Sequence, residues 1–236
     1  LAALERMAGL SDTEGAAAPD LVSDAVDVLD GAYRQSGKLE KAARLYDAKI
    51  TLAGSDSDRV RLLQELAGLW EQDLNRPDEA LRALRVAFEL DPRDDGMLAD
   101  LERLAETCNM WESLRGLAET VTRNEALDRD SGKDLLVRAA GWYLDHMGDA
   151  AAGEAALRAA IAVDAETIEA HERLVTLLRG AGRERDLVTA LRAFADADHD
   201  EVGKRERLRE AASVAASVGD VGLAASCLEA LLEVDG

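Results

Sequence analysis

Six short breaks divide most of this sequence into segments of similar length. Each break lies between two helical patterns and contains a glycine or an asparagine: Gly37, Asn75, Asn109, Gly148, Gly182 and Gly219. The intervals between them are 38, 34, 39, 34 and 37 residues. Glycine and asparagine tolerate the left-handed backbone conformation that ends many helices. The breaks therefore predict tight helix–turn–helix corners, and their regular spacing predicts tandem helix hairpins.

The segments between the breaks carry helical patterns. Apolar residues recur three or four positions apart, as at Leu62, Leu66 and Leu69, whereas sustained alternation typical of strands is missing. Pro77 suits the first turn of a helix, where its missing N–H leaves no bond unmade. We expect paired helices at 20–35 with 38–53, 57–74 with 77–90, 94–108 with 110–125, 131–147 with 149–163, 166–180 with 183–196, and 203–217 with 220–234.

The expected domain organisation is one array preceded by a short remnant. Residues 1–19 are predicted to contain a helix left over from an earlier hairpin, followed by a linker, and residues 20–236 to form the array. Its hairpins are expected at about 20–53, 57–90, 94–125, 131–163, 166–196 and 203–234. The sequence starts at Leu1 and ends within a helical pattern. We therefore expect it to be a segment of a longer protein, in which case a targeting signal would lie outside it.

A larger repeat unit is visible when the sequence is compared with itself. Residues 61–92 placed over 134–165, at an offset of 73 without gaps, share nine identities. The long and short intervals between corners also alternate. Both observations favour a unit of two hairpins, occurring three times.

The hairpins resemble the tetratricopeptide repeat (TPR) family, as found in bacterial helical repeat arrays. The second hairpin carries Leu63, Leu66, Ala67 and Trp70, then Ala80, Leu84, Ala87 and Pro92, at the family's spacing. The fourth hairpin repeats the pattern with Leu136, Ala139, Ala140, Tyr143, Gly148, Leu157 and Ala160, and both carry one extra residue before the corner. The odd-numbered hairpins fit less closely. The resemblance implies an all-α solenoid of about six stacked antiparallel hairpins in a right-handed superhelix.

The resemblance also implies where a partner binds. In the TPR family the first helices of the hairpins line a concave groove that holds peptides or protein segments. The corresponding positions here are Asp24, Asp27, Arg34, Arg61, Gln64, Glu71, Arg103, Glu106, Val137, Asp145, Glu169, Glu172, Arg179 and Arg209. Trp142 is added as an aromatic candidate for a partly exposed contact, because Tyr143 takes the packing position beside it. The Lys/Asn/Arg clamp of one peptide-binding subset is missing from these positions.

Composition excludes several other classes of protein. The formal net charge is −20 and the pI is about 4.5, which argues against a nucleic-acid binder. The sequence contains no apolar run long enough to insert into a membrane. Two cysteines cannot form a disulfide framework, and no signal peptide is visible, so we expect a cytoplasmic rather than a secreted protein.

Residues that could perform chemistry do not converge. His146, His171 and His199 lie 25 and 28 residues apart and match no zinc motif. Cys108 and Cys227 are expected to be packing residues rather than reactive thiols. The acidic run from Asp196 to Glu201 lacks the glycine and glutamate of a calcium loop and is expected to cap a helix. We therefore expect no catalytic site, no metal site and no cofactor.

Three functions remain for an array of this kind. The first is a non-enzymatic interaction scaffold that binds a protein or peptide partner, with the negative charge favouring a basic one. The second is a regulatory or spacer region of an enzyme or sensor whose active domain lies elsewhere. The third is end-to-end self-association through the faces of the terminal hairpins.

Overall fold

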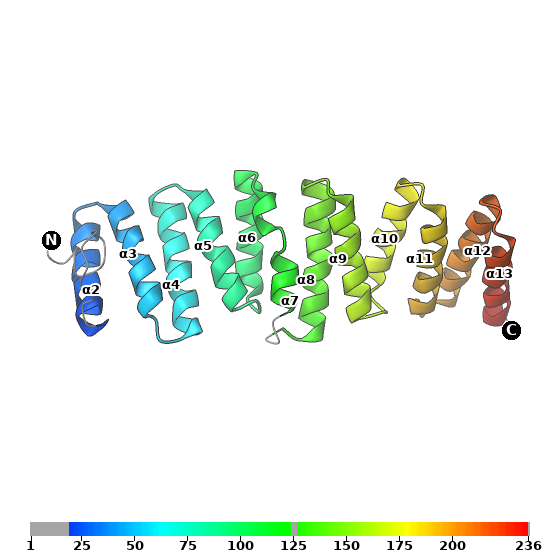
Figure 1. Cartoon of the computed structure of the whole chain (residues 1–236), viewed down its shortest axis with the longest axis horizontal. Helices are drawn as coiled ribbons and strands as arrows, with labels where there is room; N and C mark the ends of the chain where they lie inside the picture. The colour runs from blue at the N-terminus through cyan, green and yellow to red at the C-terminus, as the bar shows by residue number, and fades with distance from the viewer. Residues whose placement is uncertain (1–18, 124–126, 236) are drawn as a thin grey trace. The chain divides into compact units, whose positions relative to one another are not determined.

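The protein is built from helix hairpins that follow one another along the chain. The computed structural model describes residues 19–123 and 127–235, and no strand occurs among these residues. Figure 1 shows the helices side by side, each antiparallel to the next within its hairpin. None of the described helices combines the length and apolar character needed to cross a bilayer.

The chain divides into two compact units, residues 1–121 and 122–236. In the first unit each helix packs on the next from α2 to α6. Its described elements are α2 (Pro19–Gln35), α3 (Leu39–Leu52), α4 (Asp56–Gly68), the π-helix η1 (Leu69–Asp73), α5 (Pro77–Leu90), α6 (Asp95–Cys108), the 3₁₀-helix η2 (Trp111–Leu114) and α7 (Leu117–Thr122). The remnant helix and linker are expected at residues 1–19, of which residues 1–18 lie outside the described part of the chain and Pro19 begins α2.

The second unit repeats this arrangement. Each helix again packs on its neighbour in sequence from α8 to α13. The elements are α8 (Arg129–Gly141), the π-helix η3 (Trp142–His146), α9 (Ala150–Val163), α10 (Ile168–Gly180), α11 (Glu184–Ala197), α12 (Glu201–Ser217) and α13 (Val221–Asp235). The all-α hairpin architecture expected from the sequence is therefore confirmed.

All six expected corners adopt the left-handed conformation. The φ angles are +68° at Gly37, +51° at Asn75, +52° at Asn109, +65° at Gly148, +64° at Gly182 and +78° at Gly219. The residue that follows each corner donates its backbone N–H to a carbonyl near the end of the preceding helix, as from Lys38 to Tyr33 at 2.8 Å. These hydrogen bonds satisfy carbonyl groups that the helix ends would otherwise leave unpaired.

The extra residue in the second and fourth hairpins is accommodated by a π-helical turn. Leu74 donates its backbone N–H to Leu69, and Met147 donates to Trp142, both five residues back and at 3.1 Å. The corner hydrogen bond then spans six residues in these two hairpins, as from Arg76 to Trp70, and five in the other four. A wider turn thus absorbs one residue without changing the corner.

The second helix expected at 110–125 is wrong in part. The structure has the short 3₁₀-helix η2, then Arg115 and Gly116, and α7 only from Leu117. Gly116 has a φ of +72°, a conformation that interrupts a right-handed helix. Residues 124–126 of the expected helix lie outside the described part of the chain.

Small residues allow the helices to approach closely. Ala42, Ala80, Ala87 and Ala105 are fully buried in the first unit, and larger side chains such as Phe88 fill the space between them. Ala140, Ala160, Ala195 and Ala211 are buried in the same way in the second unit. The high alanine content therefore serves the packing of thin helical layers.

Candidate functional site

Most of the residues expected to contact a partner lie on exposed first-helix surfaces. The exposed ones are Asp24, Asp27, Arg34, Arg61, Gln64, Arg103, Glu106, Asp145, Glu169, Glu172, Arg179 and Arg209, and Glu71 is half-buried.

Trp142 and Val137 were expected to contact a partner, but this expectation is wrong because both side chains are buried. Trp142 is only 3% exposed and Val137 is 5% exposed. Trp142 occupies the position that Leu69 holds in the second hairpin, at the offset of 73, and Leu69 is buried as well. The π-helical turn starts at this position in both hairpins, and Trp142 and Tyr143 are both buried. Both corrected side chains belong to the packed interior and offer no surface to a partner.

In the first unit, several of the expected contact residues bind each other. Arg103 on α6 donates two hydrogen bonds to Glu71 on η1, at 2.6 and 3.0 Å, and also pairs with Asp100 at 3.0 Å. Gln64 on α4 donates to the carboxylate of Asp94 at 3.4 Å. The hydrogen bonds from Arg103 hold the pKa of Glu71 below its usual range. These side chains tie one hairpin to the next.

A second polar group connects α2, α3 and α4. Arg34 donates to the Tyr46 hydroxyl at 3.0 Å and to Asp30 at 3.0 Å, and Tyr46 donates to Glu65 at 3.4 Å. Glu65 also accepts from Arg61 at 2.6 Å. A cavity of about 340 Å³ adjoins this group and is lined by Asp27, Lys49, Asp58, Arg61 and Glu65, among others. The side chains that line it carry both signs of charge, and most of these charged side chains form ion pairs.

The second unit has two larger cavities, which meet at α10. The first has a volume of about 680 Å³ and is lined by Leu144, Asp145, Gly148, Ala150, Glu172, Arg173, Thr176 and Leu177. The other has about 630 Å³ and is lined by Glu172, Val175, Thr176, Arg179, Leu191, Phe194, Asp198, Asp200, Val202, Gly203, Glu206, Arg207 and Glu210. Glu172 and Thr176 belong to both linings. We call this pair of cavities the α10 groove.

The α10 groove is acidic. The cavity of about 680 Å³ contains Asp145, Glu172 and Arg173, and Arg173 pairs with Glu169 at 3.1 Å. Five carboxylates and two guanidinium groups line the cavity of about 630 Å³. Both guanidinium groups are paired, Arg179 with Glu210 at 2.7 Å and Arg207 with Asp198. Within the described part of the chain, Glu172 and Glu206 pair with no lysine or arginine side chain. Two exposed negative charges therefore face the groove without a cation.

A stack of planar groups supports the floor of the groove. The guanidinium of Arg207 lies 3.7 Å from the ring centre of Phe194, and the His171 ring stacks on the same ring at 5.4 Å. His171 is buried, and its Nε2 lies 2.8 Å from the carbonyl oxygen of Ala165. A Cβ at Gly203 would meet Arg207 and Asp198 at less than 3 Å, so this glycine gives their ion pair its room.

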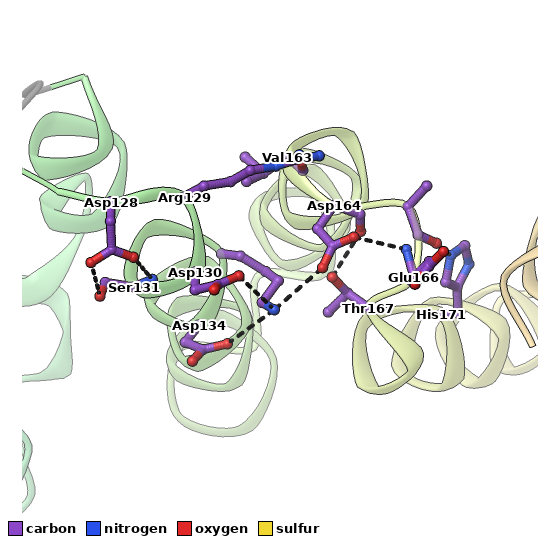
Figure 2. Close-up of polar contacts among 12 residues, drawn as sticks. Asp128, Arg129, Asp130, Ser131, Asp134, Val163, Asp164, Glu166, Thr167 and His171 are labelled. Atoms are coloured by element: carbon purple, nitrogen blue, oxygen red, sulfur yellow. Dashed lines mark hydrogen bonds and ion pairs between the residues drawn. The ribbon is translucent and has the colours of Figure 1, made fainter.

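A third polar group fastens α8 to the loop before α10. The ammonium of Lys133 lies 3.5, 4.0 and 3.3 Å from carboxylate oxygens of Asp130, Asp134 and Asp164. Figure 2 shows these three carboxylates. The backbone N–H of Glu166 and the nearby Lys133 lower the pKa of Asp164. Figure 2 also shows Arg129 reaching the backbone carbonyl of Val163 and Asp128 capping the start of α8. These contacts are structural links between neighbouring hairpins.

No family model and no curated protein sequence matches this chain. Among solved structures, it is similar to MamA, at 16% identity over 75% of this chain and 92% of that one, with a TM-score of 0.40. PilF of Pseudomonas aeruginosa is 17% identical over 89% and 90% of the two chains, with a TM-score of 0.39. A tetratricopeptide repeat protein of Parabacteroides merdae is 13% identical over 89% and 78%, with a TM-score of 0.37.

These likenesses are low in identity and in structural overlap, so the assignment of the fold rests on the hairpins and corners themselves. Each of the described hairpins ends its first segment at a left-handed residue, and small residues separate the helices. The fold of the described residues is therefore all-α and built of helix hairpins, as in TPR-like proteins.

The described part of the array contains no group of three or more histidine, cysteine, aspartate and glutamate side chains that could hold a metal ion. Asp200, in the acidic run before α12, accepts hydrogen bonds from the backbone N–H groups of Val202 and Gly203 and so caps the helix, as expected. Cys227 is buried, and burial raises the pKa of its thiol. Burial raises the pKa of the Cys108 thiol as well, which disfavours the reactive thiolate at both positions.

The sequence pattern missed several residues of the α10 groove. Thr176, Leu177 and Glu206 line it but were not among the expected contacts. Thr176 lies four residues after Glu172, and Glu206 lies three residues before Arg209, on first helices that had already been singled out. Helical periodicity could have added Thr176, because positions four apart share a face of a helix.

Proposed function

We propose that this TPR-like array is a non-enzymatic scaffold that binds an extended segment of a partner protein in the α10 groove. The observation that carries the proposal is the junction of two cavities, of about 680 and 630 Å³, at Glu172 and Thr176. Cavities of about 300–1,000 Å³ accommodate ligand groups of substantial size. A continuous segment could therefore place side chains in both cavities while its backbone crosses α10.

The charges of the groove favour a basic partner. Glu172 and Glu206 lie in the groove without a paired cation, and Asp145 lies at its other end. A lysine or arginine of the partner would complement these carboxylates. The net charge of −20 would also attract a basic partner over longer distances, and salt would weaken that attraction.

The test uses labelled peptides that differ only in charge. Three peptides of about 12 residues, one rich in Lys and Arg, one neutral and one rich in Asp and Glu, are titrated by fluorescence anisotropy. We expect the basic peptide to bind best, with a dissociation constant that rises with salt concentration. In the double variant Glu172→Lys with Thr176→Trp, one charge is reversed and both cavities are obstructed, so binding should weaken about tenfold or more.

Asp47→Lys is the matched control, because Asp47 is an exposed acid on α3 outside the α10 groove. This substitution should change the affinity for the basic peptide less than about twofold. Equal binding of the basic and acidic peptides would contradict the expected partner chemistry. Unchanged binding by the double variant would contradict the location of the site.

A further inference from the structure

One half of the α10 groove, the cavity of about 680 Å³ that Leu144 helps to line, has an equivalent position in the first unit. We call this cavity the Leu144 pocket. At the sequence offset of 73, the corners of the second and third hairpins, Asn75 and Asn109, fall on the corners of the fourth and fifth. These pairs of hairpins therefore align without gaps, and their residues can be compared one by one.

In the first unit, an ion pair occupies the equivalent position. Arg103 on α6 donates two hydrogen bonds to Glu71 on η1, at 2.6 and 3.0 Å. Leu104, the next residue of α6, is 0% exposed. The first unit thus bridges this position with its own side chains.

In the second unit, the two bridging residues are replaced by uncharged ones. Leu144 stands at the position of Glu71. Thr176 stands at the position of Arg103. Both line the Leu144 pocket, and so does Leu177, which is only half-buried although its counterpart in α6 is completely buried. The second unit is therefore open where the first unit is bridged.

Gly153 on α9 gives Leu144 its place beside the pocket. A Cβ at Gly153 would lie 2.5 Å from both Cγ and Cδ2 of Leu144, so this leucine rests directly on the backbone of α9. The corresponding residue of the first unit is Ala80, which is completely buried. The glycine thus lets the leucine side chain withdraw against α9 while the space beside it stays open.

The lining of the Leu144 pocket suits an apolar side chain. Four of its eight lining residues have no polar side-chain atom: Leu144, Gly148, Ala150 and Leu177. An apolar group that leaves water for such a surface gains free energy in proportion to the area it buries. A leucine of a bound segment would bury its side chain against these residues.

The charged groups of the pocket favour basic residues beside that side chain. Asp145 and Glu172 are exposed carboxylates of the lining. Arg173 is the one cation among the described lining residues, and it pairs with Glu169 at 3.1 Å. The other lysine and arginine side chains of α8, α9 and α10 lie outside the lining: Arg129, Lys133, Arg138, Arg158 and Arg179.

We propose that the Leu144 pocket is a specificity pocket for one leucine-sized apolar side chain of a partner segment, with lysine or arginine residues on either side of it. The inference rests on the proposed binding in the α10 groove and adds the residue that the partner must carry there. Because α10 packs on both α9 and α11, the pocket lies within the array and not at an end of the described chain.

The experiment uses the 236-residue chain and three labelled peptides of about 12 residues, each with one central residue between uniform flanks. Two peptides have Lys-rich flanks and a central Leu or Ala, and the third has a central Leu between Glu-rich flanks. We expect the Lys-flanked Leu peptide to bind about tenfold more tightly than the Lys-flanked Ala peptide, because it buries more apolar surface. It should also bind about tenfold more tightly than the Glu-flanked peptide at low salt.

Salt separates the two contributions. Fluorescence anisotropy at two salt concentrations should show weaker binding of both Lys-flanked peptides at the higher one, because salt screens their attraction to the carboxylates. The ratio of the Leu to the Ala affinity should not fall, because burial of apolar surface is not screened.

A variant outside the lining decides whether the leucine is held in this pocket. Gly153→Ala changes no lining residue, but its Cβ forces Leu144 away from α9 and into the pocket. The preference for Leu over Ala should fall from about tenfold to about twofold or less. Gly180→Ala is the matched control, because Gly180 is also helical and a Cβ there would meet no atom within 4 Å. It should leave the preference within about twofold of its original value.

A second variant keeps the test decisive if Gly153→Ala proves unstable, which circular dichroism checks. Leu144→Glu with Thr176→Arg places in the pocket the residue types that bridge the equivalent position of the first unit, and it leaves the net charge unchanged. The fold is expected to persist, because the first unit accommodates the same pair. The preference for Leu should again fall to about twofold or less.

The possible failures distinguish the pocket from the groove. Equal binding of the two Lys-flanked peptides, or a preference for Leu that survives both variants, would overturn the pocket and leave the proposed groove standing. No binding of either Lys-flanked peptide up to about 1 mM, or equal binding of the Lys- and Glu-flanked Leu peptides, would contradict the proposed function and the pocket with it. In sedimentation velocity, a dimer that Gly153→Ala dissociates would overturn the proposal in favour of a second copy as the occupant.

Discussion

At the scale of single residues, the corners carry the most information. Six residues with positive φ end the first segment of each hairpin, and four of them are glycines. Asn75 and Asn109 hold the same conformation with φ near +50°, which is costly for residues with a side chain although asparagine tolerates it better than most. Two neighbouring glycines of the fifth hairpin separate this conformational effect from packing. Gly182 has a φ of +64°, whereas Gly180 is helical, and a Cβ would meet no other atom within 4 Å at either position.

Gly182→Ala should therefore lower the free energy of unfolding by about 1–2 kcal/mol, because alanine strains the left-handed corner. Gly180→Ala should leave it unchanged or raise it by about 0.5 kcal/mol, because alanine is the better helix former. Urea titration of both variants, followed by circular dichroism, measures the difference. Similar effects from the two substitutions would show that the corner conformation does not limit stability.

At the scale of elements, the π-helices η1 and η3 explain the one-residue excess of two hairpins. Each lies at the end of the first helix of its hairpin. In both hairpins the corner hydrogen bond spans six residues instead of five, so the corner forms in the same way despite the additional residue. The 73-residue offset in sequence places the two π-helices on equivalent positions. An insertion that would rotate a helix by about 100° is thereby confined to one turn.

Deletion of Gln72, an exposed residue within η1, should convert the π-turn to an α-turn and change the free energy of unfolding by less than about 1 kcal/mol. Deletion of Gln64, an exposed residue of α4, is the matched control. It rotates the buried Leu66 and Ala67 away from the core and should cost about 3 kcal/mol or more. Urea titration measures the free energy of unfolding of both deletion variants. An equal decrease in the two variants would mean that η1 does not absorb the extra residue.

At the scale of the whole molecule, the chain comprises two compact units, and the described residues of each form three hairpins. Within each unit a helix packs on its neighbours in sequence. Repeat arrays of this kind gain their stability from the hairpins and from the contacts between adjacent hairpins.

We therefore expect residues 122–236 to fold when expressed alone, with the helical circular dichroism of three hairpins and a cooperative thermal transition. Residues 164–236 form the control. This fragment retains two hairpins, and repeat arrays need about three for stability. Its thermal transition should occur at a lower temperature or be absent. A fragment 122–236 that is unfolded in isolation would show that its compactness depends on the rest of the chain.

Patterns of neighbouring residues predicted much of the fold. The corners and the paired helices both depend on local conformation or on periodicity over one or two turns, so they could be anticipated. The prediction of a continuous helix at 110–125 was wrong at Gly116, because a single glycine within an apolar pattern does not indicate a positive φ. Trp142 was misplaced because the effect of the extra residue on side-chain direction depends on the π-turn that accommodates it.

The sequence by itself thus determined that this protein is a chain of helix hairpins with acidic surfaces. Only the tertiary structure decided which first-helix side chains are available to a partner. Arg103 and Glu71 are 32 residues apart in sequence and bind each other, whereas Glu172 and Thr176 lie where two cavities meet. The exposure of Leu228 and Leu232 on α13 was likewise decided by packing. The physical reason is that conformation and periodicity are set by adjacent residues, while pairing, burial and cavity shape depend on distances between hairpins.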